Sequence, residues 1–560
     1  MSIEINTDVL SVILYFLRYN RRSLHSCLLV NRLWCELTIP ILWRDPWTFF
    51  YRLENTSSPS VQNQPIKLIN TYLSLLPQES IIELQNNGIN VPIYQYKSTL
   101  NYPSYLRGLD LDYLNRSILR WHYKYNEKHS THPFQKAVTR LKKFCKKVTG
   151  RDDSIETTND EDRIRYDQIH LICSKLLSLF FKESPKLSLI RIKQKKYEIP
   201  FPLFENLVKL DETKNCLSYL TGLECVDDHN MEEIYTHLAL NNTNISQIMI
   251  HGYRNTSSLA NLISVQKKLQ KLYIVNVSRV SPNDYWTTPG VGLELQRKAP
   301  FITILKLEGS CRFLELLKDF INLKEFSLRC VHRNSCINNN NNNRLLVKAP
   351  KLINLEKFEF ECDHKYEIKF IVDLIKSTRH LRKVIIEGSR ILDPTNCNLL
   401  LDSIKTYCPR LKNCSIPLST IDPPLITLLR SCKEIQRLCL FSVPSANQIN
   451  INYCDNFLLQ ILEFEKLEPT NLRTLELINC SFSVEVWEKF LKTQYETYGI
   501  YNTKETRKSV SYLWMEYNFY PPSEFLEICS LYKKLGMLKT YENISSCKSG
   551  LSPKYSLRLD

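Results

Sequence analysis

The chain has 560 residues, of which 43% are hydrophobic and only 12 are glycine. This length and apolar content exclude a mainly disordered chain and predict one large solenoid or several domains. The net charge of +16 is spread over a large surface, so it is only a weak bias towards acidic partners. The nucleotide-binding, zinc-protease and serine-hydrolase motifs are absent from the sequence, which therefore gives no support for an enzyme. We expect no catalytic residues, no cofactor and no metal.

Cysteine is frequent, with 19 residues, but no C-x-x-C pair occurs. Many copies lie inside apolar runs, as around Cys27, Cys439 and Cys480, which favours buried thiols over disulfides. The apolar run from Val9 to Leu17 follows acidic residues without a basic segment, so it does not resemble a signal peptide. No apolar run approaches the roughly 20 residues that span a bilayer. We therefore expect a cytoplasmic or nuclear protein without membrane association.

The first fifty residues predict three short helices. Asn6 and Thr7 can cap a first helix whose apolar positions, from Val9 to Leu17, cover much of its circumference. This helix has too many apolar positions for one packing face. We therefore expect it to pack against its own neighbours on one side and against something else on the other.

A second helix is predicted to start at Ser23, whose hydroxyl would cap it, and a third to run from Asn31 to Thr38 and end at Pro40. The apolar segment after it includes Trp43 and Trp47, which we expect to pack in the core or against the next domain. A unit of about 40 residues is near the lower limit of independent stability, so its surplus apolar surface indicates a partner. A helical cap on the domain that follows is the alternative.

The residues INTDVLSVILYFL, SLHSCLLVNRLW and ILW, within residues 5–43, resemble an F-box. The family's opening Leu-Pro is Ile5 and Asn6 here, so the proline that usually contacts the adaptor is missing. The resemblance implies that this segment binds a Skp-type adaptor and, through it, a cullin. It also implies that the adaptor-facing surface includes Ile5, Val9, Ile13, Leu17, Leu28, Val30 and Trp34.

The long remainder repeats the pattern L-x-x-L-x-L, with other apolar residues allowed at the Leu positions. Eight copies follow one another at about 29 residues per unit, a period compatible with leucine-rich repeats. They start at Leu269, Ile302, Leu323, Leu355, Leu381, Leu411, Ile435 and Leu472. Weaker copies start at Leu106, Leu187, Leu220, Ile245 and Val510.

The end of each copy alternates like a strand, and the segments between copies carry apolar residues at helical spacing. The ranges 313–320, 370–378, 399–407 and 425–432 are predicted helices. A strand and a helix in each unit predict a curved α/β solenoid, a horseshoe whose inner sheet faces a ligand. We expect a protein target there. The predicted substrate-binding residues are Tyr273, Lys306, Ser327, Glu359, Ser415 and Glu476, and Ile385 and Cys439 should face the same surface.

Three segments interrupt this pattern. Residues 55–64 are polar and read as a linker. Residues 136–151 predict a basic helix, but an acidic stretch follows it, so a solvated face is favoured over nucleic-acid binding. The asparagine run within 336–344 predicts a loop between units. The expected domains are an F-box over 1–48, a linker and helical junction over 49–100, a solenoid over 101–540 with a charged insertion near 140–165, and a tail over 541–560.

An F-box followed by leucine-rich repeats resembles the F-box/leucine-rich-repeat family. The resemblance implies a non-catalytic substrate receptor of a Skp-cullin-F-box ubiquitin ligase, which presents a protein target for ubiquitination and proteasomal degradation. The alternative is a leucine-rich-repeat interaction scaffold without ligase association. Nucleic-acid binding through the basic segment is a third class of function, and it predicts steep salt dependence.

Overall fold

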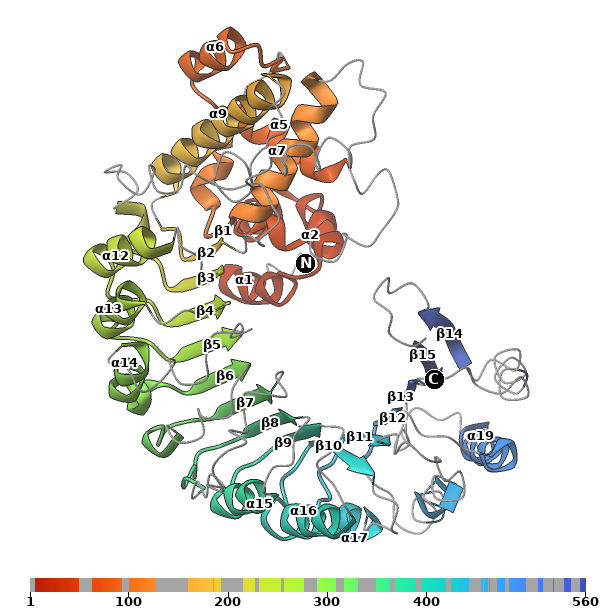
Figure 1. The fold of residues 1–560 in the computed structure, drawn as a ribbon. Helices are drawn as coiled ribbons and strands as arrows, with labels where there is room; N and C mark the ends of the chain where they lie inside the picture. The colour runs from red at the N-terminus through yellow and green to blue at the C-terminus, as the bar shows by residue number, and fades with distance from the viewer. Residues whose placement is uncertain are drawn as a thin grey trace. The chain divides into compact units, whose positions relative to one another are not determined.

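The computed structural model divides into two compact units (Figure 1). Unit 1 comprises Met1–Lys271 and Asn283–Leu295, and unit 2 comprises Leu272–Pro282 and Gln296–Asp560. The structure describes residues 6–49, 63–92, 100–126, 160–184, 186–192, 215–226, 231–252, 256–275, 290–308, 317–330, 349–362, 368–387, 394–418, 425–442, 455–456, 458–461, 463, 471–478, 483–499, 512–516, 527, 538–544 and 554–559.

Three short helices open unit 1: α1 (Thr7–Phe16), α2 (Arg21–Leu28) and α3 (Arg32–Leu42). An asparagine caps each of them, because the side-chain oxygens of Asn6, Asn20 and Asn31 accept backbone N–H groups at 2.8, 3.2 and 3.0 Å. The prediction of Asn6 as the first cap is confirmed. The prediction that the second helix starts under the hydroxyl of Ser23 is wrong, since Asn20 takes that role and the helix begins two residues earlier.

Proline does not end the third helix, and the prediction that it would is wrong. Pro40 lies inside α3, which continues to Leu42. A proline removes only its own N–H, and the following turn still closes, because the backbone N–H of Trp43 donates to the carbonyl of Ile39 at 3.0 Å.

The three helices enclose a small core of their own. Leu10, Leu14 and Cys27 are buried at its centre. Partly buried apolar side chains pack around this centre: Leu17, Trp34, Leu37 and Ile41.

The segment after α3 joins this helical start to the rest of unit 1. Trp47, in the 3-10 turn η1 (Pro46–Phe49), is completely buried against Tyr72 and Phe180. The ring of Trp43 stacks on that of Tyr102, with centroids 4.0 Å apart. The prediction of core packing for Trp47 is therefore confirmed, and Trp43 packs beside it while partly exposed.

A buried ion pair also ties this segment to the sheet of unit 1. Arg191 lies 2.8 Å from Asp45 and 3.4 Å from Glu224, and all three side chains are at most one-fifth exposed. His251 lies 3.4 Å from Glu224. The backbone of Gly108 passes so close that an added Cβ would lie 2.8 Å from the carboxyl of Asp45. Glycine at this position therefore leaves room for the ion pair.

Unit 1 continues with helices and parallel strands. Its remaining helices and turns are α5 (Gln64–Leu73), α6 (Gln78–Asn86), η2 (Tyr102–Tyr105), α7 (Leu111–Asn126), α9 (Asp160–Glu183), α12 (Met231–Asn241) and α13 (Ser257–Val265). Its strands β1 (Gly108–Asp110), β2 (Leu189–Ile192), β3 (Gly222–Val226) and β4 (Gln247–His251) pair in parallel and in chain order. The division between the units falls within β5 (Lys271–Val275) and within α14 (Val291–Lys298).

Unit 2 is built from parallel strands with helices between them. The turn η3 (Ala299–Phe301) precedes β6 (Ile304–Glu308), β7 (Glu325–Cys330), β8 (Lys357–Cys362), β9 (Lys383–Glu387), β10 (Asn413–Leu418), β11 (Arg437–Ser442), β12 (Thr474–Ile478) and β13 (Tyr512–Glu516). The helices are α15 (Ile368–Ser377), α16 (Pro394–Tyr407), α17 (Leu425–Ser431) and α19 (Val484–Gly499). Figure 1 shows α15, α16 and α17 side by side along one face of the strands.

The repeat pattern is confirmed at every copy. Each strand from β1 to β13 begins two residues after the first apolar residue of its copy, the weak copies at Leu106 and Val510 included. The last two apolar positions of the strong copies are buried throughout, as Leu305 and Leu307 show on β6. The fold is therefore α/β with a parallel sheet, and its strand-plus-helix units agree with a repeat solenoid.

Three of the four predicted helices between copies are confirmed as α15, α16 and α17; the fourth, over 313–320, lies mostly outside the described residues. The linker over 55–64, the basic segment over 136–151 and the asparagine run also lie outside them, except for the first residues of α5. Where we expected a tail, the structure has β14 (Leu538–Ile544) and β15 (Lys554–Leu559), and β15 pairs antiparallel with β13 and β14. Within the described ranges, every helix falls short of what a bilayer crossing requires.

Candidate interaction surfaces

Helix α1 carries two apolar stripes. Leu10, Leu14 and Leu17 face the three-helix core, at the spacing of one helix face. The remaining apolar positions have the same spacing but are exposed, with 53% of Val9, 44% of Ile13 and 76% of Phe16 open to solvent. We call Val9, Val12, Ile13 and Phe16 the α1 stripe. Because its members are three and four residues apart, they form one continuous face, and each keeps at least 44% of its surface open to solvent.

More apolar side chains are exposed where α2 ends and α3 begins. Leu29 is 77% exposed, and Val30 and Leu33 are also open to solvent. A three-helix unit with one enclosed core and two exposed apolar regions has more apolar surface than its own packing requires.

The structure divides the predicted adaptor-facing residues into two groups. Val9, Ile13 and Val30 are exposed, as an interface requires. Leu17 and Trp34 are partly buried in the three-helix core, and Leu28 is also partly buried. Ile5 lies outside the described residues. The sequence reasoning missed four exposed side chains that the helical period could have shown: Val12, Phe16, Leu29 and Leu33.

The predicted substrate-binding residues lie together on the sheet of unit 2. Strand pairing places them next to one another in register across β6 to β12: Lys306, Ser327, Glu359, Ile385, Ser415, Cys439 and Glu476. On β5, Tyr273 extends this row, because the Lys306 ammonium lies 5.6 Å from the centre of its ring. We call this row, with the strand residues two positions before and after it, the open sheet face.

Most charges on the open sheet face are paired with one another. Lys383 lies 2.6 Å from Glu359, and Arg437 lies 2.8 Å from Glu476. On neighbouring strands, Lys357 pairs with Glu325 at 2.5 Å and Arg329 with Glu361 at 2.7 Å. These pairs hold the long side chains in fixed positions across the strands, so the face presents a defined pattern of charge.

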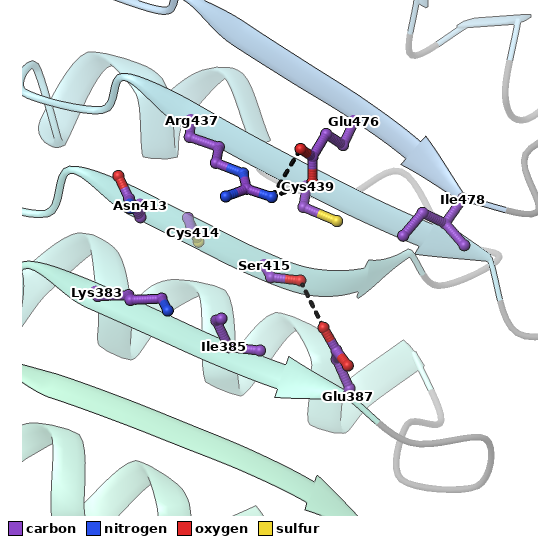
Figure 2. Close-up of a pocket in the computed structure, with 10 residues that line it drawn as sticks. All are labelled: Lys383, Ile385, Glu387, Asn413, Cys414, Ser415, Arg437, Cys439, Glu476 and Ile478. Atoms are coloured by element: carbon purple, nitrogen blue, oxygen red, sulfur yellow. Dashed lines mark hydrogen bonds and ion pairs between the residues drawn. The ribbon is translucent and has the colours of Figure 1, made fainter. Parts of the chain in front are cut away.

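A pocket of about 450 Å³ opens in this face, over β9 to β12 (Figure 2). Its volume is within the range of ligand-binding pockets. The predicted residues Ile385, Ser415, Cys439 and Glu476 line it. The sequence analysis did not identify the other lining residues, most of which lie two positions from a predicted residue on the same strand face: Lys383, Glu387, Asn413, Cys414, Arg437 and Ile478.

Two carboxylates on this face have opposite electrostatics. Burial alone would raise the pKa of Glu359, but the hydrogen bond and charge of Lys383, with Lys306 and Ser327, outweigh it, so this pKa is lowered. For Glu387, burial and the negative charge of Glu361 raise the pKa, and a hydrogen bond from Ser415 only partly offsets them. Ionisation of Glu387 is therefore unfavourable in the folded protein, whereas ionisation of Glu359 is favoured.

The two thiols of the pocket are buried and have raised pKa values, which disfavours the reactive thiolate form. Burial, with the carboxylates of Glu476 and Glu387, raises the pKa of the Cys439 thiol to about 12, although Ser415 acts in the opposite direction. Burial also holds the pKa of Cys414 well above its ordinary value. The ten cysteines whose side chains are described form no disulfides, and nine are buried, so the predicted buried thiols are confirmed for these residues. The described residues contain no group of three or more side chains placed to hold a metal ion.

Comparisons with known proteins give little beyond this geometry. No protein-family model matches the sequence, and no curated protein matches it. One similar solved structure is described as that of the Toll–Spatzle complex, a molecular hub in Drosophila development and innate immunity. It shares 11% sequence identity and a TM-score of 0.28 over 62% of this chain and 47% of that chain. A similarity this low carries no argument about function.

Proposed function

We propose that the chain is a non-catalytic substrate receptor of a Skp-cullin-F-box ubiquitin ligase. Its N-terminal helices would bind a Skp-type adaptor, and its open sheet face would hold a protein target for ubiquitination. The observation that carries the proposal is the α1 stripe, a continuous apolar face that remains exposed although the helix already packs its other face.

The exposed apolar surface of the N-terminal helices can supply a large favourable contribution to the free energy of binding. Covering roughly 400 Å² of apolar surface at about 25 cal/mol per Å² would supply on the order of 10 kcal/mol before the cost of association. A helix packing in an apolar groove is a common mode of protein recognition. The exposed residues Leu29, Val30 and Leu33 would extend the contact beyond α1.

The position of the open sheet face supports its proposed role as the target-binding surface. Its residues alternate with buried ones along each strand, so the scaffold fixes their spacing while their identities can vary. Mixed charge with scattered apolar groups such as Ile385 and Ile478 suits a protein surface better than a uniform polyanion.

Capture of the adaptor tests the proposal. The full chain, co-expressed with a Skp-type adaptor, should retain it through affinity and size-exclusion steps. The double variant Val9→Asp/Ile13→Asp should lose it, because two carboxylates would be buried without partners. Leu240→Asp on α12 is the matched control, since Leu240 is apolar and 78% exposed but lies outside the three helices. Failure of the unaltered chain to retain the adaptor would refute the proposal.

The second candidate function is a leucine-rich-repeat scaffold without ligase association, whose N-terminal helices only cap the repeats. The burial of Trp47 against Phe180 favours it, because the segment is part of the core of unit 1. A capping role requires only the apolar stripe of α1 that faces the core, however, and does not explain why the α1 stripe on the other side is apolar. In the scaffold, Val9→Asp/Ile13→Asp would leave all binding partners unchanged, whereas deletion of the residues before Asn55 would destabilise unit 1.

A further inference from the structure

The pocket on β9 to β12 contains one carboxylate without a cation. Its two basic side chains already have partners, since Lys383 lies 2.6 Å from Glu359 and Arg437 lies 2.8 Å from Glu476. Among the described residues, Glu387 has no basic group within ion-pair distance; its contact is the hydroxyl of Ser415 at 3.5 Å. Because Lys383 is paired with Glu359, outside the lining, Glu387 is the lining carboxylate without an ion-pair partner among the described residues.

The surroundings of Glu387 make this charge costly. It is partly buried at the end of β9, and Glu361 faces it from the next strand in register. Arg329, whose charge also acts on Glu387, is already paired with Glu361 at 2.7 Å. Burial and Glu361 both raise the pKa of Glu387, and the hydrogen bond of Ser415 with the charge of Arg329 offsets them only in part.

The walls beside Glu387 indicate the shape of its ligand. Ile385 lies two residues before Glu387 on the same face of β9, and both line the pocket (Figure 2), whereas Ile478 lines its far side on β12, three strands away. An apolar wall beside a carboxylate suits a side chain with an aliphatic stem and a cationic head. Arginine fits better than lysine, because its planar guanidinium is weakly hydrated and can donate to both carboxylate oxygens.

We infer that this pocket binds an arginine side chain of the target, with its guanidinium on Glu387 and its stem along Ile385. The inference rests on the proposed role of the open sheet face as the target-binding surface. It adds the class of residue that a target must present, a basic side chain in an accessible segment. It does not depend on the N-terminal helices.

Methyl NMR of the full chain, labelled at the isoleucine δ1 methyls, tests the inference. The probes are acetyl-Ala-Arg-Ala-amide and its citrulline analogue, which has nearly the same shape without the charge. The arginine peptide should shift the Ile385 signal in a saturable manner, and should shift the Ile478 signal, on the far side of the pocket, by less. The citrulline peptide should bind at least about tenfold more weakly.

Two variants locate the binding. Glu387→Gln should weaken the arginine peptide at least about tenfold. Glu308→Gln should leave its affinity unchanged, because Glu308 lies in the same row of the sheet on β6, outside the pocket. Unchanged isoleucine signals elsewhere in the spectrum would show that both variants are folded.

Several results would overturn the inference: no shift with the arginine peptide, equal binding of the citrulline peptide, or full affinity in Glu387→Gln. Equal losses in both variants would show a nonspecific response to charge and would also overturn it. Adaptor retention is measured on the same Glu387→Gln protein and should be unaffected. Failure of the pocket and failure of the proposed ligase function are therefore separate results.

Discussion

The α1 stripe and the open sheet face are both exposed, but the first is apolar and the second is charged. The α1 stripe consists of apolar side chains on one helix, each at least 44% exposed. On the open sheet face, the long charged side chains are mostly paired with each other, and Glu387 is the exception among those that line the pocket. Apolar surface gains free energy from any close-fitting cover, whereas a face of paired charges gains it only from a partner with matching charges. The first region is therefore suited to a stable complex, and the second to selective recognition of a partner with complementary charges.

The largest expected effect is the difference in stability between a substitution in the buried stripe of α1 and one in its exposed stripe. Leu14→Ala should lower the stability of the three-helix segment by about 2–5 kcal/mol, because Leu14 is completely buried. Ile13→Ala should change it by less than about 0.5 kcal/mol, since Ile13 is half exposed. Hydrogen exchange of the α1 amides measures both. Equal effects would show that the two faces of α1 do not differ as described.

A smaller effect should come from the ion pair that ties the helical start to the sheet of unit 1. Arg191→Met should lower local stability by about 1–3 kcal/mol, because it leaves Asp45 and Glu224 with little solvent and no guanidinium. Arg329→Met, on the open sheet face, should cost less than about 1 kcal/mol, since its pair with Glu361 is largely exposed. Hydrogen exchange at β2 and β7 measures the two changes. A larger loss at β7 would contradict this ranking.

Salt should act in opposite directions on the two surfaces. Raising sodium chloride from about 0.05 M to about 0.5 M shortens the range of charge interactions several-fold. Binding of the arginine peptide should therefore weaken several-fold, whereas retention of the adaptor should remain or increase. Titration and pull-down at each salt concentration test this. Loss of the adaptor at high salt would indicate that charge, and not the α1 stripe, holds it.

The smallest effect concerns Glu359 and Glu387, whose pKa values are shifted in opposite directions. Glu359 has a lowered pKa, so its contribution to stability is present above the unfolded value of about 4.3 and is lost as pH falls through the folded one. Glu387 has a raised pKa, so its ionisation costs stability as pH rises. At pH 7, Glu359→Gln should destabilise and Glu387→Gln should stabilise, each by less than about 1 kcal/mol. Urea unfolding at pH 7 and pH 3 would show a difference at pH 7 that shrinks at pH 3.

The sequence predicted the repeats well because the physical signal is local. An apolar residue three positions before an alternating pair recurs in every unit, and Leu106 and Leu187 revealed even the two shortest strands, β1 and β2. Helix boundaries were less predictable, since Asn20 and Ser23 are both good caps and only packing selects between them. The roles of Leu17 and Trp34 were also undetermined, because a helix that is apolar all round does not show which side faces its own core.

The pocket could be predicted only in part. The motif identifies Ser415 and Glu476 as exposed strand positions, but the pairing of their neighbours depends on which strands lie next to each other. That Glu387 lacks a cation while Glu359 has one follows from the register of β8 against β9, not from either sequence segment. Long-range pairing of this kind is not encoded in a single repeat.

The two-sided character of α1 has one more consequence. A helix of 10 residues is only marginally stable by itself in water, yet α1 is held in shape by Leu10 and Leu14 from the inside. A binding partner would therefore meet a surface that is already folded and would lose no free energy in ordering it. Association at this surface should resemble the docking of two rigid bodies, with a rate set by diffusion and orientation, not by a folding step.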